Sequence, residues 1–361
     1  LLFVTIYIFY KMNRYSEYGN DAPSHFLVFF LIFEIILLKN KSNISDIVNN
    51  LAICLFVILN KVMLVGIAMT SFLIISKKYI VRILKNKKFI FIGFFLVMWI
   101  LKNILSTGCA LYPVKFTCID NLIWVNLSEI QKISTSGEAW SKGISDLSKK
   151  NKKKYINNED FNKNFNWISI WSKKHLIVII EILIPYLIFC FLGIFLIIKK
   201  KLLNNKKIDK YYLNLFLILL ICNLIWFIKA PLFRYGYSFI ISLVGVALSL
   251  MMLKLNLNKK KLFLFSNIII VAGITIFTTK NLYRIYDNEN KYYNYPWPKY
   301  YSMDGSNIKN KFKVRYINKE KILIPTEGYC MYIKGICNHY DFDENLKLKI
   351  YKNYKVFFLN K

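Results

Sequence analysis

Long apolar runs separated by short lysine-rich clusters dominate the pattern of hydrophobic and polar positions along the chain. Each run approaches the roughly 18 residues that a helix needs to cross the hydrocarbon core of a bilayer. The pattern therefore predicts spanning helices near residues 22–38, 89–105, 175–198, 211–229, 237–253 and 262–279. A further apolar stretch at 1–10 is expected to be the tail of a helix whose beginning precedes Leu1.

The lysine clusters between these runs indicate how the chain alternates across the membrane. Cytoplasmic loops carry an excess of Lys and Arg, so the clusters at 39–43, 77–88, 199–207 and 254–261 are assigned to the cytoplasm. Four regions are then expected outside: residues 11–21, the long loop 106–174, the short turn KAPLFRYG and the tail from 280. This predicts a multi-span domain at 1–279, with an external loop at 106–174, and an extracytoplasmic domain at 280–361.

The segment 47–76 lies between two predicted cytoplasmic clusters and must therefore cross the membrane an even number of times. Lys61 stands at its middle, where a single straight crossing would place an ammonium group in the centre of the bilayer. We therefore expect a short helical hairpin or two half-spanning helices.

Composition supports a membrane class and excludes several others. The chain has 361 residues, of which 56% are hydrophobic, and a formal net charge of +31. Because the lysines form short clusters between apolar runs rather than a basic stripe with stacking aromatics, no nucleic-acid partner is expected. The sequence contains no phosphate-binding GxxxxGK[ST] motif and no GxGxxG, HExxH or GxSxG motif.

The tail and the cysteines give two further expectations. Residues 280–361 hold short β-prone runs separated by Gly, Asn and Asp, which favours a small α/β or mostly β domain. Cys109 and Cys118, and Cys330 and Cys337, form two local pairs in the regions assigned outside, so each pair is predicted to form a disulfide. Four unpaired thiols are the alternative, and His339 beside Cys337 is a lone candidate metal ligand.

The first candidate site lies just before the helix expected at 22–38. Glu17, Asp21 and His25 are spaced by four and would share one face if that helix extended backward. A carboxylate beside a histidine can deprotonate a sugar hydroxyl or hold a divalent metal, here Mg or Mn. The simpler alternative is that Asn20 or Asp21 caps the helix.

The turn KAPLFRYGYS and an acid within a predicted span provide the second group of candidates. Arg234 and Lys229 would lie at headgroup depth, where a guanidinium can bind a lipid phosphate or can merely snorkel among interface tyrosines. Glu181 lies about two turns inside a predicted spanning helix and either lines the same outer cavity or is a packing residue. Together these loops predict an acid and an anion-binding group on one membrane face.

Several of these segments resemble known proteins. EYGNDAPSHFL, STGCALYP with the following Cys118, APLFRYGYS and the late EGYC and GIC segments resemble uncharacterised bacterial polytopic proteins of cell-envelope polysaccharide loci. More remotely, the acid-bearing first external loop resembles the GT-C class of lipid-dependent glycosyltransferases, which implies a GT-C-like helix bundle. Asp21 matches the catalytic acid of that class and Glu17 a second acid, whereas Asn20 stands where that class often has a neighbouring acid.

This resemblance leads to a functional hypothesis. We expect an inverting transfer of a sugar from a polyprenyl phosphate or pyrophosphate to an envelope glycan or lipid, at the outer face of the bacterial inner membrane. Asp21 would be the base and Arg234 would bind the phosphate. One alternative is a polysaccharide polymerase or ligase that relies on external arginines without an essential base, and another is a non-catalytic transport or assembly component.

Overall fold

The structure of the chain is a computed structural model. It describes residues 1–12, 21–39, 43–76, 79–146, 157–203, 207–289, 312–326, 335–338, 346–351 and 354–359. Contacts divide the chain into two compact units. The first unit consists of Leu1–Trp99 and Ile133–Arg284, and the second of Ile100–Lys132 and Ile285–Lys361.

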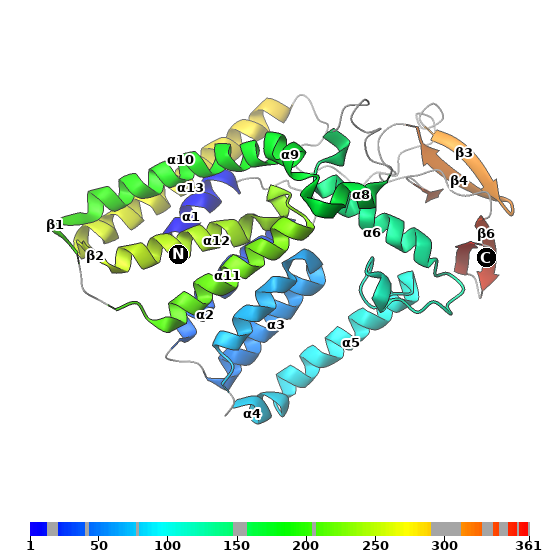
Figure 1. The fold of residues 1–361 in the computed structure, drawn as a ribbon, viewed down its shortest axis with the longest axis horizontal. Coiled ribbons are helices and arrows are strands. Elements are labelled where there is room, and N and C mark those ends of the chain that lie inside the picture. Colours follow the sequence, from blue (N-terminus) through cyan, green and yellow to red (C-terminus); the bar gives the residue numbers. More distant parts are fainter. Residues whose placement is uncertain are drawn as a thin grey trace. The chain divides into compact units, whose positions relative to one another are not determined.

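Six helices of the described residues are long and apolar enough to cross a membrane (Figure 1). They are α2 (Asp21–Leu38), α5 (Lys87–Thr107), the segment Ile168–Ile197 that contains α9 (Ile168–Trp171) and α10 (Ile177–Ile197), α11 (Lys210–Lys229), α12 (Phe233–Leu253) and α13 (Lys259–Glu289). All six spans predicted from hydropathy are therefore confirmed as helices. The last extends ten residues beyond its predicted end at 279.

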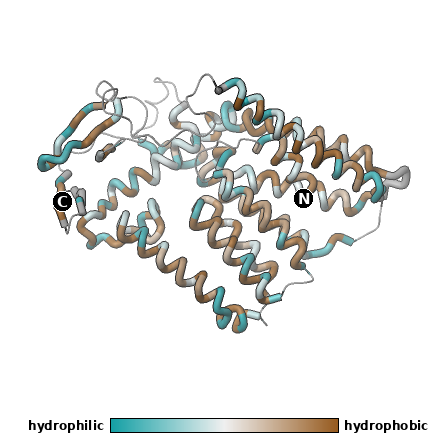
Figure 2. The backbone as a smooth tube through the Cα atoms, turned by 180° about the vertical axis from the view of Figure 1, so that it is seen from behind, coloured by the Kyte–Doolittle hydropathy of each residue, from teal (hydrophilic) through white to brown (hydrophobic). Residues whose placement is uncertain are grey.

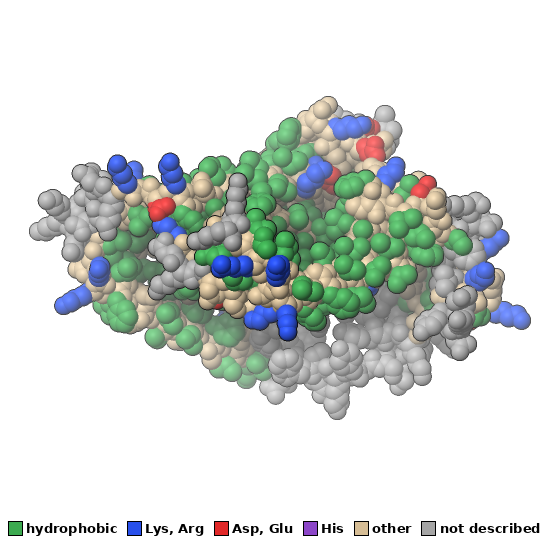
Figure 3. All heavy atoms as spheres, turned by 90° about the horizontal axis from the view of Figure 1, so that it is seen from below, with side chains coloured by type: hydrophobic (Ala, Val, Ile, Leu, Met, Phe, Trp, Pro, Cys, Tyr) green, Lys and Arg blue, Asp and Glu red, His purple; other side chains and the backbone are tan. Residues whose placement is uncertain are grey.

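The long helices carry apolar side chains on their outer surfaces as well as in the core. Phe195 on α10 and Val271 on α13 are among many large hydrophobic side chains that are mostly exposed. Apolar stretches run along the helices in Figure 2, and hydrophobic side chains cover much of the face drawn in Figure 3. An apolar surface of this extent is unfavourable in water and suits contact with lipid tails. The chain thus has the character of a multi-pass membrane protein.

Aromatic rings from four helices form the centre of the first unit. Tyr7 of α1 (Leu2–Lys11) packs edge-on against Phe29 of α2 and Tyr186 of α10, and its ring also contacts Tyr237 of α12. The Tyr186 hydroxyl donates to the carbonyl oxygen of Phe3 at 2.9 Å. These contacts satisfy a buried polar group and hold α1 against its neighbours.

A helical hairpin follows α2, as the sequence predicts for 47–76. Its arms are α3 (Ile44–Asn60) and the 3₁₀ helix η1 (Val62–Leu73), which pack against each other. Lys61 has an extended backbone (φ −144°, ψ 93°) and separates the two arms. The hairpin tip is therefore a lysine.

Contacts at the ends of the helices fix which termini lie together in the first unit. At one end Lys39, which follows α2, forms an ion pair with Asp209, whose side chain caps the start of α11. Hydrogen bonding to Lys39 holds the pKa of the Asp209 carboxyl below its usual range. At the same end β1 (Ile198–Leu203) pairs with β2 (Leu255–Leu257), which joins the end of α10 to the end of α12.

The described part of the C-terminal tail is built from strands. In the second unit β3 (Phe312–Ile317) and β4 (Glu320–Pro325) are antiparallel, β5 (Ile336–Cys337) is parallel to β4, and β6 (Leu346–Tyr351) pairs with β7 (Tyr354–Leu359). A small apolar core of Ile317, Ile322 and Leu348 links the two sheets. The expectation of a small, mostly β structure in this tail is confirmed for the described residues.

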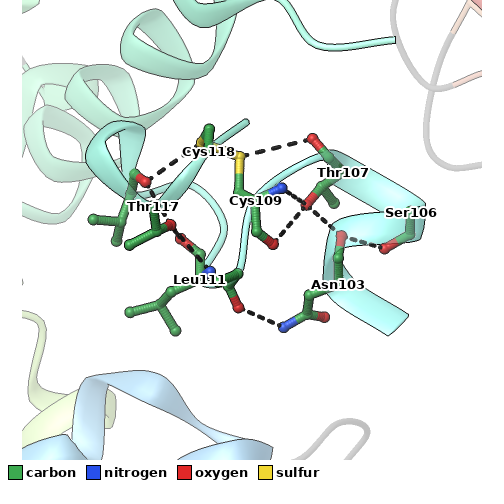
Figure 4. The surroundings of a disulfide bond; sticks show 9 residues. Asn103, Ser106, Thr107, Cys109, Leu111, Thr117 and Cys118 are labelled. Carbon is green, nitrogen blue, oxygen red and sulfur yellow. Dashed lines mark hydrogen bonds between the residues drawn. A yellow bond between two sulfur atoms is a disulfide. The ribbon is translucent and has the colours of Figure 1, made fainter. Parts of the chain in front are cut away.

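The second unit also contains one of the predicted disulfides, between Cys109 and Cys118 (Figure 4). Asn103 and Thr107, at the end of α5, hydrogen-bond to the backbone of the closed loop. Cys337 is also disulfide-bonded, whereas its predicted partner Cys330 and the candidate ligand His339 lie outside the described residues. Among the described residues, three further cysteines are free and buried: Cys54, Cys190 and Cys222.

Candidate functional site

Three chain segments far apart in sequence meet at the end of the first unit opposite the Lys39–Asp209 pair. Asp21 is the first residue of α2, Lys61 is the tip of the hairpin, and Arg234 lies in the first turn of α12. The Lys61 ammonium donates to Oδ1 of Asp21, and Nε of Arg234 lies 3.9 Å from Oδ2 of the same carboxylate. One carboxylate thus faces two cations.

Burial differs strongly among these three side chains. The Lys61 side chain is 6% exposed, that of Asp21 is 35% exposed and that of Arg234 is 57% exposed. Lys61 is therefore a buried cation, and Arg234 is open to a ligand. The carboxylate between them is partly accessible from the side of Arg234.

The surroundings of Lys61 explain how a lysine is tolerated at the middle of an apolar hairpin. Besides Asp21, its ammonium group lies 3.5 Å from the carbonyl oxygen of Arg234 and 4.7 Å from the centre of the Tyr235 ring. A buried charge is stable only when it is paired and hydrogen-bonded, and an aromatic face adds a favourable cation–π contact. The hairpin tip is thereby fixed against the starts of α2 and α12.

His25 holds the same region together from inside. It is fully buried, with Nδ1 2.6 Å from the hydroxyl of Ser238 and Nε2 2.9 Å from the carbonyl oxygen of Arg234. Because a carbonyl only accepts, Nε2 carries the proton. The imidazole also packs against the Tyr237 ring, with ring centres 3.9 Å apart and the two planes tilted by 35°. Both nitrogens are occupied, so His25 positions the first turn of α12.

The Arg234 guanidinium contacts two aromatic rings. Its central carbon is 5.1 Å from the Tyr235 ring centre and 5.6 Å from that of Trp140 on α6 (Leu127–Ser141). Its Nη2 donates to the Tyr235 hydroxyl at 3.2 Å. These contacts hold the guanidinium in place, and its remaining N–H groups can donate to an anion.

The end of α6 is attached beside this cluster by a second group of charges. Glu138 accepts from Lys142 at 2.5 Å and lies 3.9 Å from Lys229, the last residue of α11. Lys142 is buried, with its ammonium 5.0 Å from the centre of the Trp167 ring. Nearby, the indole of Trp171 donates to the carbonyl oxygen of Pro231 at 2.6 Å.

Charge is unevenly balanced in this region. The two groups together hold four cations and two carboxylates: Lys61, Lys142, Lys229, Arg234, Asp21 and Glu138. The surplus resides on Arg234 and Lys229, which are the exposed cations. An anionic group such as a phosphate fits such a surplus, because exposed cations stabilise it without first losing a buried partner.

Comparison with known proteins places the chain in a family. Residues 1–241, two thirds of the chain, match the family described as Domain of unknown function (DUF8201). The chain belongs to the DUF8201 family. Asp21, Lys61 and Arg234 all lie within the matched residues. Searches of curated proteins and of solved structures give no match.

The sequence candidates fall into distinct places in this DUF8201 chain. Asp21, His25 and Arg234 come together, whereas Lys229 contacts Glu138 on α6. Glu181 is exposed on α10 among exposed isoleucines and is not part of the cluster. The predicted second acid, Glu17, lies outside the described residues.

Other members of the site were not predicted to belong to it. Lys61 was the only one with a sequence signal, since an isolated lysine in an apolar segment requires a partner. Glu138 and Trp140 lie in a polar helix of the long loop and Lys142 directly follows it, and nothing in the sequence distinguishes the three. Ser238 was missed because its role depends on His25, which is 213 residues away in sequence.

The described residues of the DUF8201 chain do not fit a divalent metal ion. No group of three or more His, Cys, Asp or Glu side chains suited to a metal occurs among them. The Asp21 carboxylate faces an ammonium and a guanidinium, which would repel a second cation. We therefore assign no chemical step to Mg or Mn.

Proposed function

We propose that this protein transfers a sugar from a polyprenyl phosphate or pyrophosphate to a cell-envelope glycan or lipid. The observation that supports this most is the cluster of Asp21, Lys61 and Arg234 at one end of a bundle of apolar helices. It combines a partly accessible carboxylate with an exposed guanidinium where a lipid headgroup would lie. We further propose that this end faces the outside of the bacterial inner membrane, together with the C-terminal strands.

The proposed reaction uses the carboxylate and the guanidinium in different roles. An acceptor hydroxyl oxygen attacks the anomeric carbon of the donor, and the bond between that carbon and the phosphate oxygen breaks. The phosphate leaves with the electron pair and is stabilised by Arg234, whose planar donors match phosphate oxygens. Asp21 accepts the hydroxyl proton. Attack opposite the leaving group inverts the anomeric centre.

The apolar part of such a donor also has a suitable place on the first unit. A groove of about 450 Å³ lies between α1, α10 and α13, lined by apolar side chains that include Phe9, Tyr186 and Ile276. Its size and composition suit part of an isoprenoid chain. A donor with one long hydrocarbon tail and an anionic head would therefore use both features of this unit.

A second function is favoured by the contacts of Asp21 itself. Both of its oxygens face cations, so the carboxylate is already engaged in holding Lys61 and Arg234. In a polysaccharide polymerase or ligase, Arg234 would stabilise the leaving pyrophosphate and no protein base would be essential. Asp21 would then only position Lys61 and Arg234.

Transfer by the purified full chain in lipid nanodiscs distinguishes these functions. The assay uses radiolabelled polyprenyl-phosphate and polyprenyl-pyrophosphate sugars, with envelope glycan and lipid extracts as acceptors. The variants are Asp21→Asn and Arg234→Ala. Asp209→Asn is the matched control, because Asp209 is also a partly exposed carboxylate paired with a lysine, but at the other end of the unit.

Each function predicts a different result. Loss of transfer in Asp21→Asn and in Arg234→Ala, with Asp209→Asn active, supports the proposed transferase. Full activity in Asp21→Asn with loss in Arg234→Ala supports the polymerase or ligase. If no donor is used and unmodified polyprenyl phosphate does not bind the wild-type protein, both functions are wrong.

A further inference from the structure

Trp140 lies in the site but has no role in the reaction proposed above. The residue is 45% exposed, although one face of its indole lies against the Arg234 guanidinium. Burying a large exposed indole against a ligand releases water from an apolar surface. Because Arg234 contacts both Trp140 and Asp21, a group bound to the guanidinium lies next to the indole and to the carboxylate.

Gly137 leaves open space on the same side of α6. It precedes Trp140 by three residues, so the two lie on one face of the helix. A methyl group built at Gly137 meets no atom within 4 Å, so neither packing nor backbone geometry requires a glycine there. A glycine inside a helix is less favourable than an alanine. The open surface over Gly137 and the exposed indole form what we call the Gly137–Trp140 ledge.

The ledge is held rigidly. Glu138 and Lys142, on either side of Trp140, are tied together at 2.5 Å, and Lys142 is buried against the Trp167 ring. Glu138 is further linked to Lys229. These contacts fix the last turn of α6, and a fixed aromatic surface is what positioning of a ligand requires.

We infer that the Gly137–Trp140 ledge binds the sugar ring of the donor while Arg234 binds its phosphate. The inference rests on the proposed function and names the part of the protein that recognises the sugar. A pyranose has one face rich in C–H groups, which packs on an indole, and the open surface over Gly137 leaves room for the ring beside Trp140. Trp140 would thus be a specificity-determining residue beside the reacting centre.

Binding of two lipids that differ only in the sugar tests the inference. The probes are polyprenyl phosphate and polyprenyl-phosphate hexose, titrated against the full chain in nanodiscs. Trp140→Ala removes the indole, Trp140→Phe keeps an aromatic face, and Gly137→Leu fills the open space. Gly93→Leu is the control, because Gly93 is a helical glycine in α5 with equally open surroundings.

We expect Trp140→Ala and Gly137→Leu to weaken binding of the hexose lipid by about two- to tenfold, the range that one aromatic contact supplies. Binding of bare polyprenyl phosphate should stay within about twofold, since Arg234 remains. Trp140→Phe should be intermediate and Gly93→Leu unchanged.

Other outcomes separate the inference from the proposed function. Equal weakening of both lipids would mean that Trp140 only supports Arg234, and the ledge would be rejected. If Gly93→Leu also weakened hexose-lipid binding, the effect would come from a bulky residue on any helix, and the ledge would again be rejected. Unchanged hexose binding in Trp140→Ala, with wild-type transfer intact, rejects the ledge and keeps the function. If the wild type binds neither lipid, the function and the inference fail together.

Discussion

Replacing Asp21 with alanine leaves the Lys61 ammonium without its carboxylate partner. Removing one partner of a buried ion pair costs about 3–5 kcal/mol, because the remaining charge stays desolvated. Here the Lys61 side chain is only 6% exposed, but it keeps the Tyr235 ring at 4.7 Å and the Arg234 carbonyl at 3.5 Å. The space left by Asp21 also opens to water. We therefore expect Asp21→Ala to lower the free energy of unfolding by about 2–3 kcal/mol.

Replacing Lys61 instead should cost far less. In Lys61→Met a chain of similar length fills the buried space, and the Asp21 carboxylate, already 35% exposed, keeps Arg234 at 3.9 Å. At that distance an attraction screened by water is worth about 1 kcal/mol. We expect a loss below about 1 kcal/mol for Lys61→Met. The double variant Asp21→Ala/Lys61→Met should then be more stable than Asp21→Ala alone.

The assay is reversible unfolding of the four proteins in mixed detergent micelles, followed by circular dichroism. The double-mutant cycle should give a coupling energy of about 2 kcal/mol between Asp21 and Lys61. Asp209→Ala controls for loss of a carboxylate from a partly exposed pair and should cost less than Asp21→Ala. Additive effects of the two single variants, or a larger loss in Lys61→Met than in Asp21→Ala, would refute the reasoning that Lys61 is a buried charge neutralised by Asp21.

Three other predictions concern the surroundings of the site and the second unit. His25→Ala should destabilise the protein by about 2–4 kcal/mol, because it removes a fully buried ring and two hydrogen bonds, and thermal melting in detergent will show whether it does. Reducing the Cys109–Cys118 disulfide should lower the stability of the second unit by about 2–3 kcal/mol, because the short loop it closes gains conformational entropy when unfolded. Limited proteolysis should therefore cleave between the two cysteines faster after reduction. Equal cleavage rates would contradict this. Because the pKa of Asp209 is lowered, its pairing with Lys39 stabilises the fold at pH values above the usual Asp pKa, and this stabilisation is lost as the pH falls through the lowered pKa. Asp209→Asn should therefore weaken the dependence of the free energy of unfolding on pH in the acid range, measured by denaturation at a series of pH values.

The arrangement of helices was largely predictable from hydropathy. A run of about 18 apolar residues has few alternatives to a spanning helix, and all six predicted spans are helical. Boundaries were less predictable, because polar residues can continue a helix beyond the apolar run, as in α13 from 279 to Glu289. The hairpin was predictable because Lys61 is incompatible with one straight crossing, but its arms were not, since no local pattern requires the 3₁₀ geometry of Val62–Leu73.

The candidate site was only partly predictable. Because charged residues are excluded from apolar spans, Asp21 and Arg234 were expected at the ends of spans. The alternation of spans then put both residues on the same side of the membrane, so their proximity could be predicted. Their link through Lys61 could not be derived, because it depends on how far the hairpin extends beside α2. The contribution of Trp140 was hidden for a different reason. It arises from tertiary packing of a polar loop helix, which periodicity does not report.

Because Lys61 and Asp21 form an ion pair, one labelling experiment is enough to determine how the first unit is oriented across the membrane. It places the hairpin tip at the membrane face where α2 begins, so both hairpin ends, together with Lys39 and Asp209, belong to the opposite face. A single cysteine introduced at residue 43 and labelled from one side of intact cells would therefore assign every one of these positions at once.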